Sequence, residues 1–230
     1  MKILAKIRNR RGETITIIRY HKSLQERVMD LFREGYPISF DGADLRKIKK
    51  SVRGKTDKTF LLAFHEEELV GCLTGLEKAE GPHNVYVMDY LYVKKDFRNK
   101  DVATILLGIE EEILKSKARL IIGINTGILP DYDLSFGWFK KMEFVVLGVV
   151  KYWFRSDLPG VFMGKVNPHI PLGKEIPKNS GWDETIADSI SGKRISEQEY
   201  NSIINDPGQT PKGKWGLDLI GRRHVIECHI

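Results

Sequence analysis

The sequence contains few of the residues that build metal centres and disulfide frameworks. Its 230 residues include only two cysteines, Cys72 and Cys228, and six scattered histidines. The two cysteines lie far apart and form no CxxC pair, so we interpret each as a buried or idle thiol. The sequence therefore predicts neither a disulfide framework nor a metal site.

Long apolar segments are also missing. No apolar run approaches the roughly 18 residues that a membrane-spanning helix needs. The first residues, MKILAKIRNRR, have charges too close together for the apolar core of a signal peptide. We therefore expect a cytoplasmic protein that makes no membrane contact.

The charge balance is basic but has no clear focus. Lysine and arginine total 37 against 31 acidic residues, for a net charge of +6. The basic residues are spread along the chain, and neither zinc-finger spacing nor an aromatic RNA-binding signature is present. We interpret the charge as a solvated surface that is compatible with polyanionic ligands, and we expect no nucleic-acid partner.

The most informative stretch is residues 85–115. Residues 85–93 are rich in β-branched and aromatic residues and are largely apolar on both parities, which predicts a strand buried on both faces. From residue 102 to 115 the apolar residues recur at helical spacing, and Glu110, Glu111 and Glu112 lie largely off that stripe. A turn with four basic residues, 94–101, joins the two. Free N–H groups and the dipole at such a helix start bind anions such as phosphate.

The flanking segments predict an alternation of strands and helices. We expect a helix that starts at Ser23, with Glu26 completing a capping box, and that ends at Gly35. Glu66, Glu67 and Glu68 form a predicted hairpin turn. Further helices are expected at residues 41–50 and 132–144, and further strands at residues 15–20, 60–65, 69–77, 119–125, 145–155 and 161–166.

The chain changes character after residue 166. Residues 167–230 hold prolines and glycines typical of a linker and too few apolar residues for a core of their own. We therefore expect a main domain over residues 1–166 and a C-terminal extension over residues 167–230. The extension would pack on the main domain or on a partner subunit, so a homodimer is one expected arrangement.

Residues 85–115 resemble the acyl-CoA-binding core of the GNAT N-acetyltransferase superfamily. Leu91-Tyr92-Val93 matches the Leu-x-Val at the end of that strand, and Arg98 and Ala103 match the first and last residues of the Arg/Gln-x-x-Gly-x-Gly/Ala turn. Two positions depart from the pattern: Asp101 replaces the usual glycine, and Asn99 stands where a second glycine is common.

The resemblance implies a fold and a ligand. The fold is α/β, a mixed, twisted sheet flanked by helices, with residues 85–93 and 119–125 as parallel neighbours splayed into a cleft. The co-substrate is acetyl-CoA. Backbone N–H groups from Arg98 to Ala103 would cradle its pyrophosphate, and residues 91–93 would pair with its pantetheine. The implied binding residues are Leu91, Tyr92, Val93, Arg98, Asn99, Lys100, Asp101, Val102, Ala103 and Thr104.

The two departures leave two alternatives open. Asn and Asp tolerate left-handed backbone better than other non-glycine residues, so Asn99 and Asp101 would preserve the turn with their side chains pointing outward. Alternatively, Asp101 caps the helix and its carboxylate occupies the phosphate position. A carboxylate beside a pyrophosphate would repel it by roughly 1–4 kcal/mol.

The resemblance also implies an activity, the transfer of an acetyl group from acetyl-CoA to an amine by direct attack. Asp89, within an apolar strand, is the candidate general base, because burial raises the pKa of a carboxylate. An ion pair with a nearby lysine or arginine is the competing interpretation. The N–H of Leu91 or Tyr92 would be the oxyanion donor, and Asn125 could orient a water or the amine, or simply end its strand.

The leaving thiolate has no obvious acid. Phe139 stands where a tyrosine often protonates it in the superfamily, and Glu143 replaces a usual glycine. Tyr132 is the candidate acid, with Tyr152 as another nearby tyrosine. Together with Asp101 these departures favour the alternative function, a GNAT-like binding or regulatory module that has lost catalysis. Residues 36–40 are expected either near the acceptor or as a plain helix–helix loop.

Overall fold

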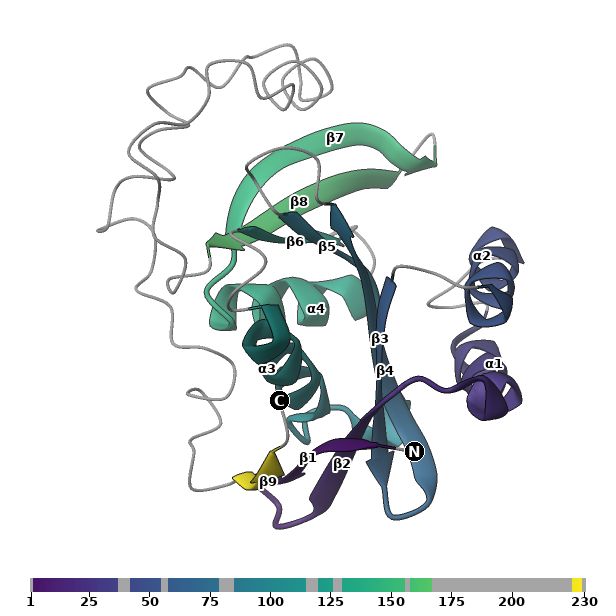
Figure 1. The fold of residues 1–230 in the computed structure, drawn as a ribbon. Coiled ribbons are helices and arrows are strands. Elements are labelled where there is room, and N and C mark those ends of the chain that lie inside the picture. Colours follow the sequence, from purple (N-terminus) through teal and green to yellow (C-terminus); the bar gives the residue numbers. More distant parts are fainter. Residues whose placement is uncertain are drawn as a thin grey trace. The chain divides into compact units, whose positions relative to one another are not determined.

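The computed structural model describes residues 2–36, 42–54, 58–78, 85–114, 120–125, 130–155, 158–166 and 225–228 (Figure 1). The chain divides into two compact units. The first comprises Met1–Glu77, Met88–Leu114 and Lys214–Ile230, and the second comprises Lys78–Val87 and Lys115–Gly213. Strand β5 (Val85–Val93) contributes to both, since the boundary falls between Val87 and Met88.

The first unit is built on an antiparallel sheet. Its strands follow the order β5-β4-β3-β2-β1-β9. Besides β5, they are β1 (Ile3–Arg8), β2 (Thr14–Arg19), β3 (Lys58–His65), β4 (Glu68–Lys78) and β9 (Val225–Cys228). The turn between β3 and β4 is the expected acidic hairpin, where Glu66 adopts φ 53°.

Strand β1 was not predicted. From Ala5 to Arg8 its sequence nevertheless alternates between apolar and charged residues. Ala5 and Ile7 are buried, whereas Lys6 is half-buried and Arg8 is exposed. The strand pairs with β2 on one side and with β9 on the other. The sheet of the first unit therefore extends beyond β2, the strand at which we expected the order of elements to begin.

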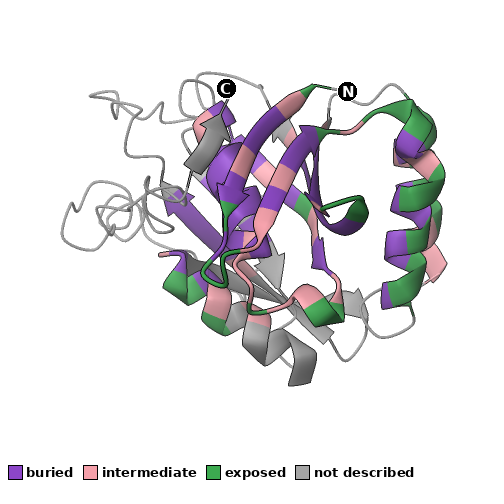
Figure 2. Cartoon of the chain, turned by 90° about the horizontal axis from the view of Figure 1, so that it is seen from below, coloured by how far each residue is buried: buried purple, intermediate pink, exposed green. Residues whose placement is uncertain are grey.

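Two helices cover one face of this sheet. Helix α1 (Gln25–Gly35) and helix α2 (Gly42–Arg53) each bury one side and expose the other (Figure 2). Phe32 of α1 lies 5.7 Å from the ring of Tyr90 and 6.2 Å from that of Tyr92. The predicted Ser23 capping box is wrong: a short 3₁₀ turn (Lys22–Leu24) precedes α1, and His21 accepts from the Ser23 N–H.

Helix α3 (Val102–Leu114) covers the opposite face of the sheet (Figure 1). The approach is close at Gly71 of β4, where an added Cβ would lie 3.0 Å from the Tyr92 oxygen and 3.2 Å from Val102 Cγ1. Glu110 and Glu111 are fully buried, so the expectation that they lie off the buried stripe is wrong. Helix α3 is enclosed around most of its circumference, and its apolar stripe alone did not indicate this.

The second unit contains the remaining elements. Its sheet follows the order β7-β8-β6-β5, with β6 (Leu120–Asn125), β7 (Val145–Arg155) and β8 (Leu158–Val166). The first residues of β5, Val85–Val87, pair in parallel with Leu120–Ile122. The predicted mixed α/β sheet flanked by helices is therefore confirmed, including the parallel neighbours. The cleft expected between them stays a prediction.

Helix α4 (Pro130–Lys141) ends in an aromatic cluster. Phe139 is buried, and its ring lies 5.1 Å from those of both Trp138 and Phe144. Glu143, in the usual place of a glycine, adopts φ 66°. The glutamate therefore takes the left-handed conformation that a glycine would adopt with less strain.

Candidate functional site

The turn between β5 and α3 has the backbone of a glycine turn without glycines. Asn99 has φ 59° and Asp101 has φ 61°. Both values lie in the left-handed region, which Asn and Asp enter more readily than other side chains. The shape that the resemblance assigns to glycines is therefore kept by two residues that tolerate the same conformation.

The Asp101 side chain points to the hairpin between β1 and β2. Its Oδ2 atom accepts from the Arg10 backbone N–H at 3.2 Å and lies 3.2 Å from Arg10 Nε. The Asp101 carbonyl accepts from the Ile105 N–H at 2.8 Å and so opens α3 through the backbone. Of the two alternatives for Asp101, the structure supports the outward-pointing side chain, because the carboxylate is bound by Arg10.

Asn9 is the centre of this contact. It is 3% exposed, and its Nδ2 donates to Glu13 Oε2 at 2.7 Å and to the Lys100 carbonyl at 3.2 Å. Its Oδ1 accepts from the N–H groups of Arg11 and Glu13, both at 2.9 Å. One buried amide thus holds the hairpin in shape and attaches it to the turn.

Lys100 completes the attachment with its side chain. Its Nζ donates to Glu13 Oε1 at 3.1 Å and lies 4.7 Å from the centre of the Phe97 ring. Hydrogen bonds from Asn9 and then from Lys100 lower the pKa of Glu13. We call Asn9, Arg10, Glu13, Lys100 and Asp101 the hairpin clasp. Sequence reasoning missed its first three members, although Asn9 and Gly12 between two alternating segments are a hairpin signal.

The basic charges of the turn are partly compensated. Lys100 pairs with Glu13, and Lys94 Nζ lies 2.9 Å from carboxylate oxygens of both Glu34 and Glu68. The hydrogen bond that Lys94 donates to Glu34 is the main reason that the pKa of Lys94 is raised, and the bond it donates to Glu68 adds to the effect. The anion site expected at this turn would therefore depend more on backbone N–H groups than on these two lysines.

The helix start supplies such N–H groups. Val102 and Ala103 open α3, and N–H groups in the first turn of a helix have no partner within it. Arg98 differs from expectation, because its own N–H donates to the Lys95 carbonyl at 3.2 Å. Its Nε atom donates to the Val93 carbonyl at 3.3 Å, which ties the turn to the end of β5. The expected cradle is thus narrowed to the residues after Arg98.

The end of β5 distinguishes between the two candidate oxyanion donors. The Tyr92 N–H hydrogen-bonds to Cys72, and the Lys94 N–H donates to the Val70 carbonyl at 2.9 Å, so both point to β4. Backbone N–H groups alternate in direction along a strand. The N–H groups of Leu91 and Val93 therefore point to the other edge, which favours Leu91 over Tyr92 as the donor.

Cys72 and Tyr92 themselves are enclosed side chains. Burial raises the pKa of the Cys72 thiol to about 12, which agrees with an unreactive buried cysteine. Burial is also the main reason that the pKa of Tyr92 is raised, and the nearby charge of Glu34 adds to the effect. Both groups stay protonated at neutral pH.

Asp89 does not lie where the sequence predicted. The strand was expected to be buried on both faces, but Asp89 is exposed between Met88, which is buried, and Tyr90, which is half-buried. The expected burial is therefore wrong, and burial no longer supports a role for Asp89 as the base. The neighbouring Tyr90 hydroxyl donates to Asp44 Oδ1 of α2 at 3.0 Å, which places the start of α2 beside this part of β5.

The other candidates are placed only by their backbone. Asn125 is the last residue of β6, and Tyr132 lies in the first turn of α4. Tyr152 lies in β7. Of the expected acceptor loop, Tyr36 is 50% exposed at the end of α1, and residues 37–40 fall outside the described residues. The roles of Asn125 and Tyr132 stay predictions.

Two searches of the described residues found nothing. No helix among them is long and apolar enough to cross a membrane. No group of three or more His, Cys, Asp or Glu side chains in the same ranges is placed to hold a metal ion.

Comparison with known proteins finds one family model that matches part of the chain. Residues 25–138 match the model of the acetyltransferase (GNAT) family. No curated protein matches the chain.

Several solved structures share the fold. A GNAT-family acetyltransferase from Desulfovibrio desulfuricans, described as putative, matches with a TM-score of 0.60 and 12% identity over 66% of this chain and 99% of that one. An aminoglycoside 6'-N-acetyltransferase complexed with coenzyme A matches with a TM-score of 0.53 and 17% identity, covering 68% and 98%. NAA60 of Arabidopsis thaliana in complex with acetyl-CoA matches with a TM-score of 0.54 and 16% identity, covering 66% and 98%.

Proposed function

Because residues 25–138 belong to the acetyltransferase (GNAT) family, we propose that this chain transfers an acetyl group from acetyl-CoA to an amine by direct attack. Two structures with the same fold contain coenzyme A or acetyl-CoA. The proposal does not specify the amine, because the one acceptor class that these two structures name, an aminoglycoside, belongs to a protein 17% identical to this chain.

One observation supports the proposal most directly. Asn99 and Asp101, at φ 59° and 61°, reproduce a glycine turn before α3, and the Asp101 carboxylate is bound by Arg10. The two residues that weigh most against a pyrophosphate site are therefore compatible with one. The turn, the helix start and Arg98 suit a dianionic group, because N–H dipoles and a guanidinium both favour negative charge.

The chain's own residues then have distinct roles. Asn99 to Ala103 would donate backbone N–H groups to the pyrophosphate, with Thr104 also in the first turn of α3, while Leu91 to Val93 would pair with pantetheine. The Leu91 N–H would donate to the thioester oxygen, where negative charge develops. When bound, acetyl-CoA supplies the activated acyl group.

Proton transfer remains for the side chains. We propose Asp89 as the group that accepts the amine proton through a water, because its exposed position on β5 is open to water. Asn125 would orient that water or the amine, and Tyr132 would protonate the thiolate. Phe139 has no proton to donate and lies buried between Trp138 and Phe144.

The buried Phe139 favours a second candidate, a GNAT-like module that binds acyl-CoA without turnover. The two candidates separate in one pair of experiments. Calorimetric titration with acetyl-CoA measures binding, and thiol release in the presence of a panel of small amines and amino-terminal peptides measures transfer. Binding without transfer across the panel would favour the module, and a lack of binding at millimolar acetyl-CoA would reject both.

The location and architecture remain part of the proposal. We propose a cytoplasmic protein with a domain over residues 1–166 and an extension over residues 167–230. Within the extension, β9 pairs with β1 through Ala5–Cys228, Lys6–Glu227 and Ile7–Val225. A chain ending at residue 166 should therefore unfold at a lower temperature than the full chain. Light scattering of both would show whether a homodimer depends on the extension.

A further inference from the structure

Helix α2 has a stripe of basic residues that faces away from the core. Arg46, Lys49, Lys50 and Arg53 follow the spacing i, i+3, i+4 and i+7, which places four residues on one side of a helix. All four are exposed, while Ile48 and Val52 of the same helix are buried. We call these four residues the basic face of α2.

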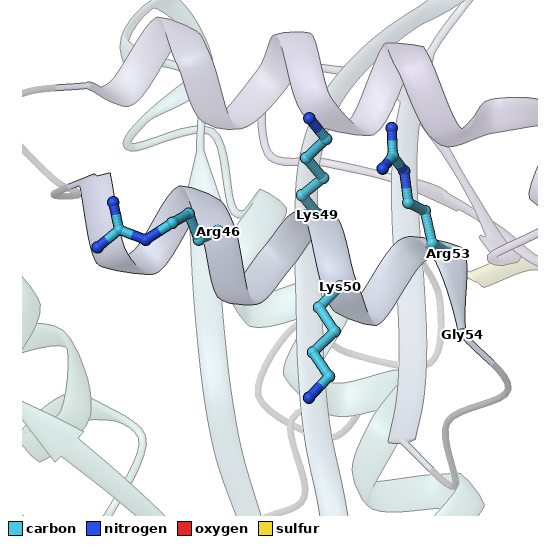
Figure 3. Close-up of a pocket in the computed structure, with 5 residues that line it drawn as sticks. All are labelled: Arg46, Lys49, Lys50, Arg53 and Gly54. Carbon is cyan, nitrogen blue, oxygen red and sulfur yellow. The ribbon is translucent and has the colours of Figure 1, made fainter.

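The basic face lines an open hollow of about 450 Å³, together with Gly54. Figure 3 shows the four side chains extending from the helix, with Lys49 and Arg53 to one side in the view and Lys50 to the other. Within the described ranges, none of the four forms an ion pair. The one acidic residue in the first turn of α2, Asp44, accepts from the Tyr90 hydroxyl instead.

This arrangement is unfavourable for the helix by itself. Like charges three or four positions apart repel one another, and the stripe contains four such pairs. An anionic partner would relieve this repulsion, so the clustering of four cations on one side of α2 points to a ligand for the face.

We propose that the basic face of α2 is a docking surface for an acidic segment of another polypeptide. A membrane partner fits less well, because the apolar residues of α2 turn inward and leave nothing to insert between lipids. Single-stranded nucleic acid also fits less well, since α2 has no aromatic residue on which a base could stack. Carboxylates need neither feature, because they bind lysine and arginine through charge and hydrogen bonds.

The length of the face sets the size of the partner segment. Arg46 and Arg53 are seven residues apart, which corresponds to roughly 10 Å along a helix. An extended peptide advances about 3.3 Å per residue, so three to five residues cover that length. An acidic run of about this size, with flanking residues, would contact all four cations.

The experiment uses fluorescein-labelled octaglutamate as the probe and the full chain as the receptor. Fluorescence anisotropy is measured at low and at physiological salt for the wild type and two variants. The first variant, R46Q/K49Q/K50Q/R53Q, removes the basic face. The second, K2Q/R8Q/R19Q/K22Q, removes the same net charge from exposed positions elsewhere. Thermal unfolding of each variant verifies that it is folded.

We expect the first variant to bind octaglutamate about tenfold more weakly or worse, and the second to change affinity less than about threefold. Higher salt should weaken wild-type binding. Equal weakening by both variants would overturn the proposal, because net charge alone would then explain it, as would a lack of binding at low salt. Tighter binding to a 20-base-pair duplex, or to vesicles containing phosphatidylserine, through the same residues would overturn the assignment to a polypeptide.

Discussion

Substitutions at Asp101 test whether backbone shape or side-chain charge controls the proposed binding of pyrophosphate at the turn between β5 and α3. Asp101→Gly and Asp101→Ala both remove the carboxylate that contacts the Arg10 N–H and Nε at 3.2 Å. They differ in what the backbone requires, because Asp101 has φ 61°. Glycine adopts that value freely, whereas a residue with a Cβ atom pays roughly 1–2 kcal/mol.

The loss of stability that the two variants share, from removing the ion pair with Arg10, should be small. The Arg10 side chain is 61% exposed, and exposed ion pairs contribute about 0.2–1 kcal/mol. Because Arg10 already compensates the carboxylate, we expect Asp101→Gly to change the acetyl-CoA affinity by less than about threefold. A carboxylate aimed at the pyrophosphate would instead predict much tighter binding in this variant.

The difference between the variants should be larger. If the alanine variant keeps the native turn, it should be roughly 1–2 kcal/mol less stable than the glycine variant. If the turn relaxes in the free protein, acetyl-CoA must restore it, and the affinity should be about 5- to 30-fold lower than in the glycine variant. Denaturant unfolding and calorimetric titration measure the two quantities separately.

Glu66 provides the matched control. It has φ 53° but lies in the exposed turn between β3 and β4. Glu66→Gly and Glu66→Ala should differ in stability by a similar amount and should bind acetyl-CoA alike. If the two Asp101 variants were indistinguishable in both stability and affinity, a left-handed turn at this position would be refuted.

Three further predictions concern titratable groups. The pKa of Glu13 is lowered in the fold, chiefly by the hydrogen bond from Asn9, so Glu13→Gln should reduce the free energy of unfolding at neutral pH. The difference in stability from the wild type should close as pH falls below 4.5, which urea unfolding at pH 7 and pH 3 measures. The pKa of Lys94 is raised, chiefly by its hydrogen bond to Glu34, so the stability lost in Lys94→Gln should be largest below pH 10.5 and should vanish at higher pH. Equal losses of stability at pH 8 and pH 11 would contradict this. Asp89→Asn should lower acetyl transfer about a hundredfold at neutral pH and less at high pH, with an unchanged melting temperature; normal turnover would remove Asp89 from the mechanism.

The sequence predicted elements best where one segment determines its own environment. Strand β5 was placed at Val85–Val93, because β-branched and aromatic residues fill most of these nine positions. Helix α3 was placed to within one residue, because its apolar spacing begins directly after the turn. The left-handed turn also followed from local chemistry, since Asn99 and Asp101 are residues that tolerate it.

The wrong or missing predictions concern burial and contacts that depend on elements distant in the sequence. Asp89 was expected to be buried because its neighbours in sequence are apolar, but exposure depends on which element covers that position of the strand. Glu110 and Glu111 are buried for the corresponding reason, since a helix stripe does not reveal how much of the helix is enclosed. The Arg10 contact to Asp101 joins residues 91 positions apart, and no local pattern predicts such a partner.

The hairpin clasp also has a consequence for the order of events during synthesis. The β1–β2 hairpin is a local structure that can form within microseconds once its 19 residues have left the ribosome. Its bonds to Lys100 and Asp101 form only once the chain has been made as far as residue 101. In the nascent chain the β1–β2 hairpin therefore exists before the turn between β5 and α3 that it contacts. That turn gains the contacts of the hairpin clasp late in synthesis. A ribosome stalled before residue 101 would display the hairpin without these bonds, whereas one stalled beyond α3 would display a chain in which the hairpin clasp can form.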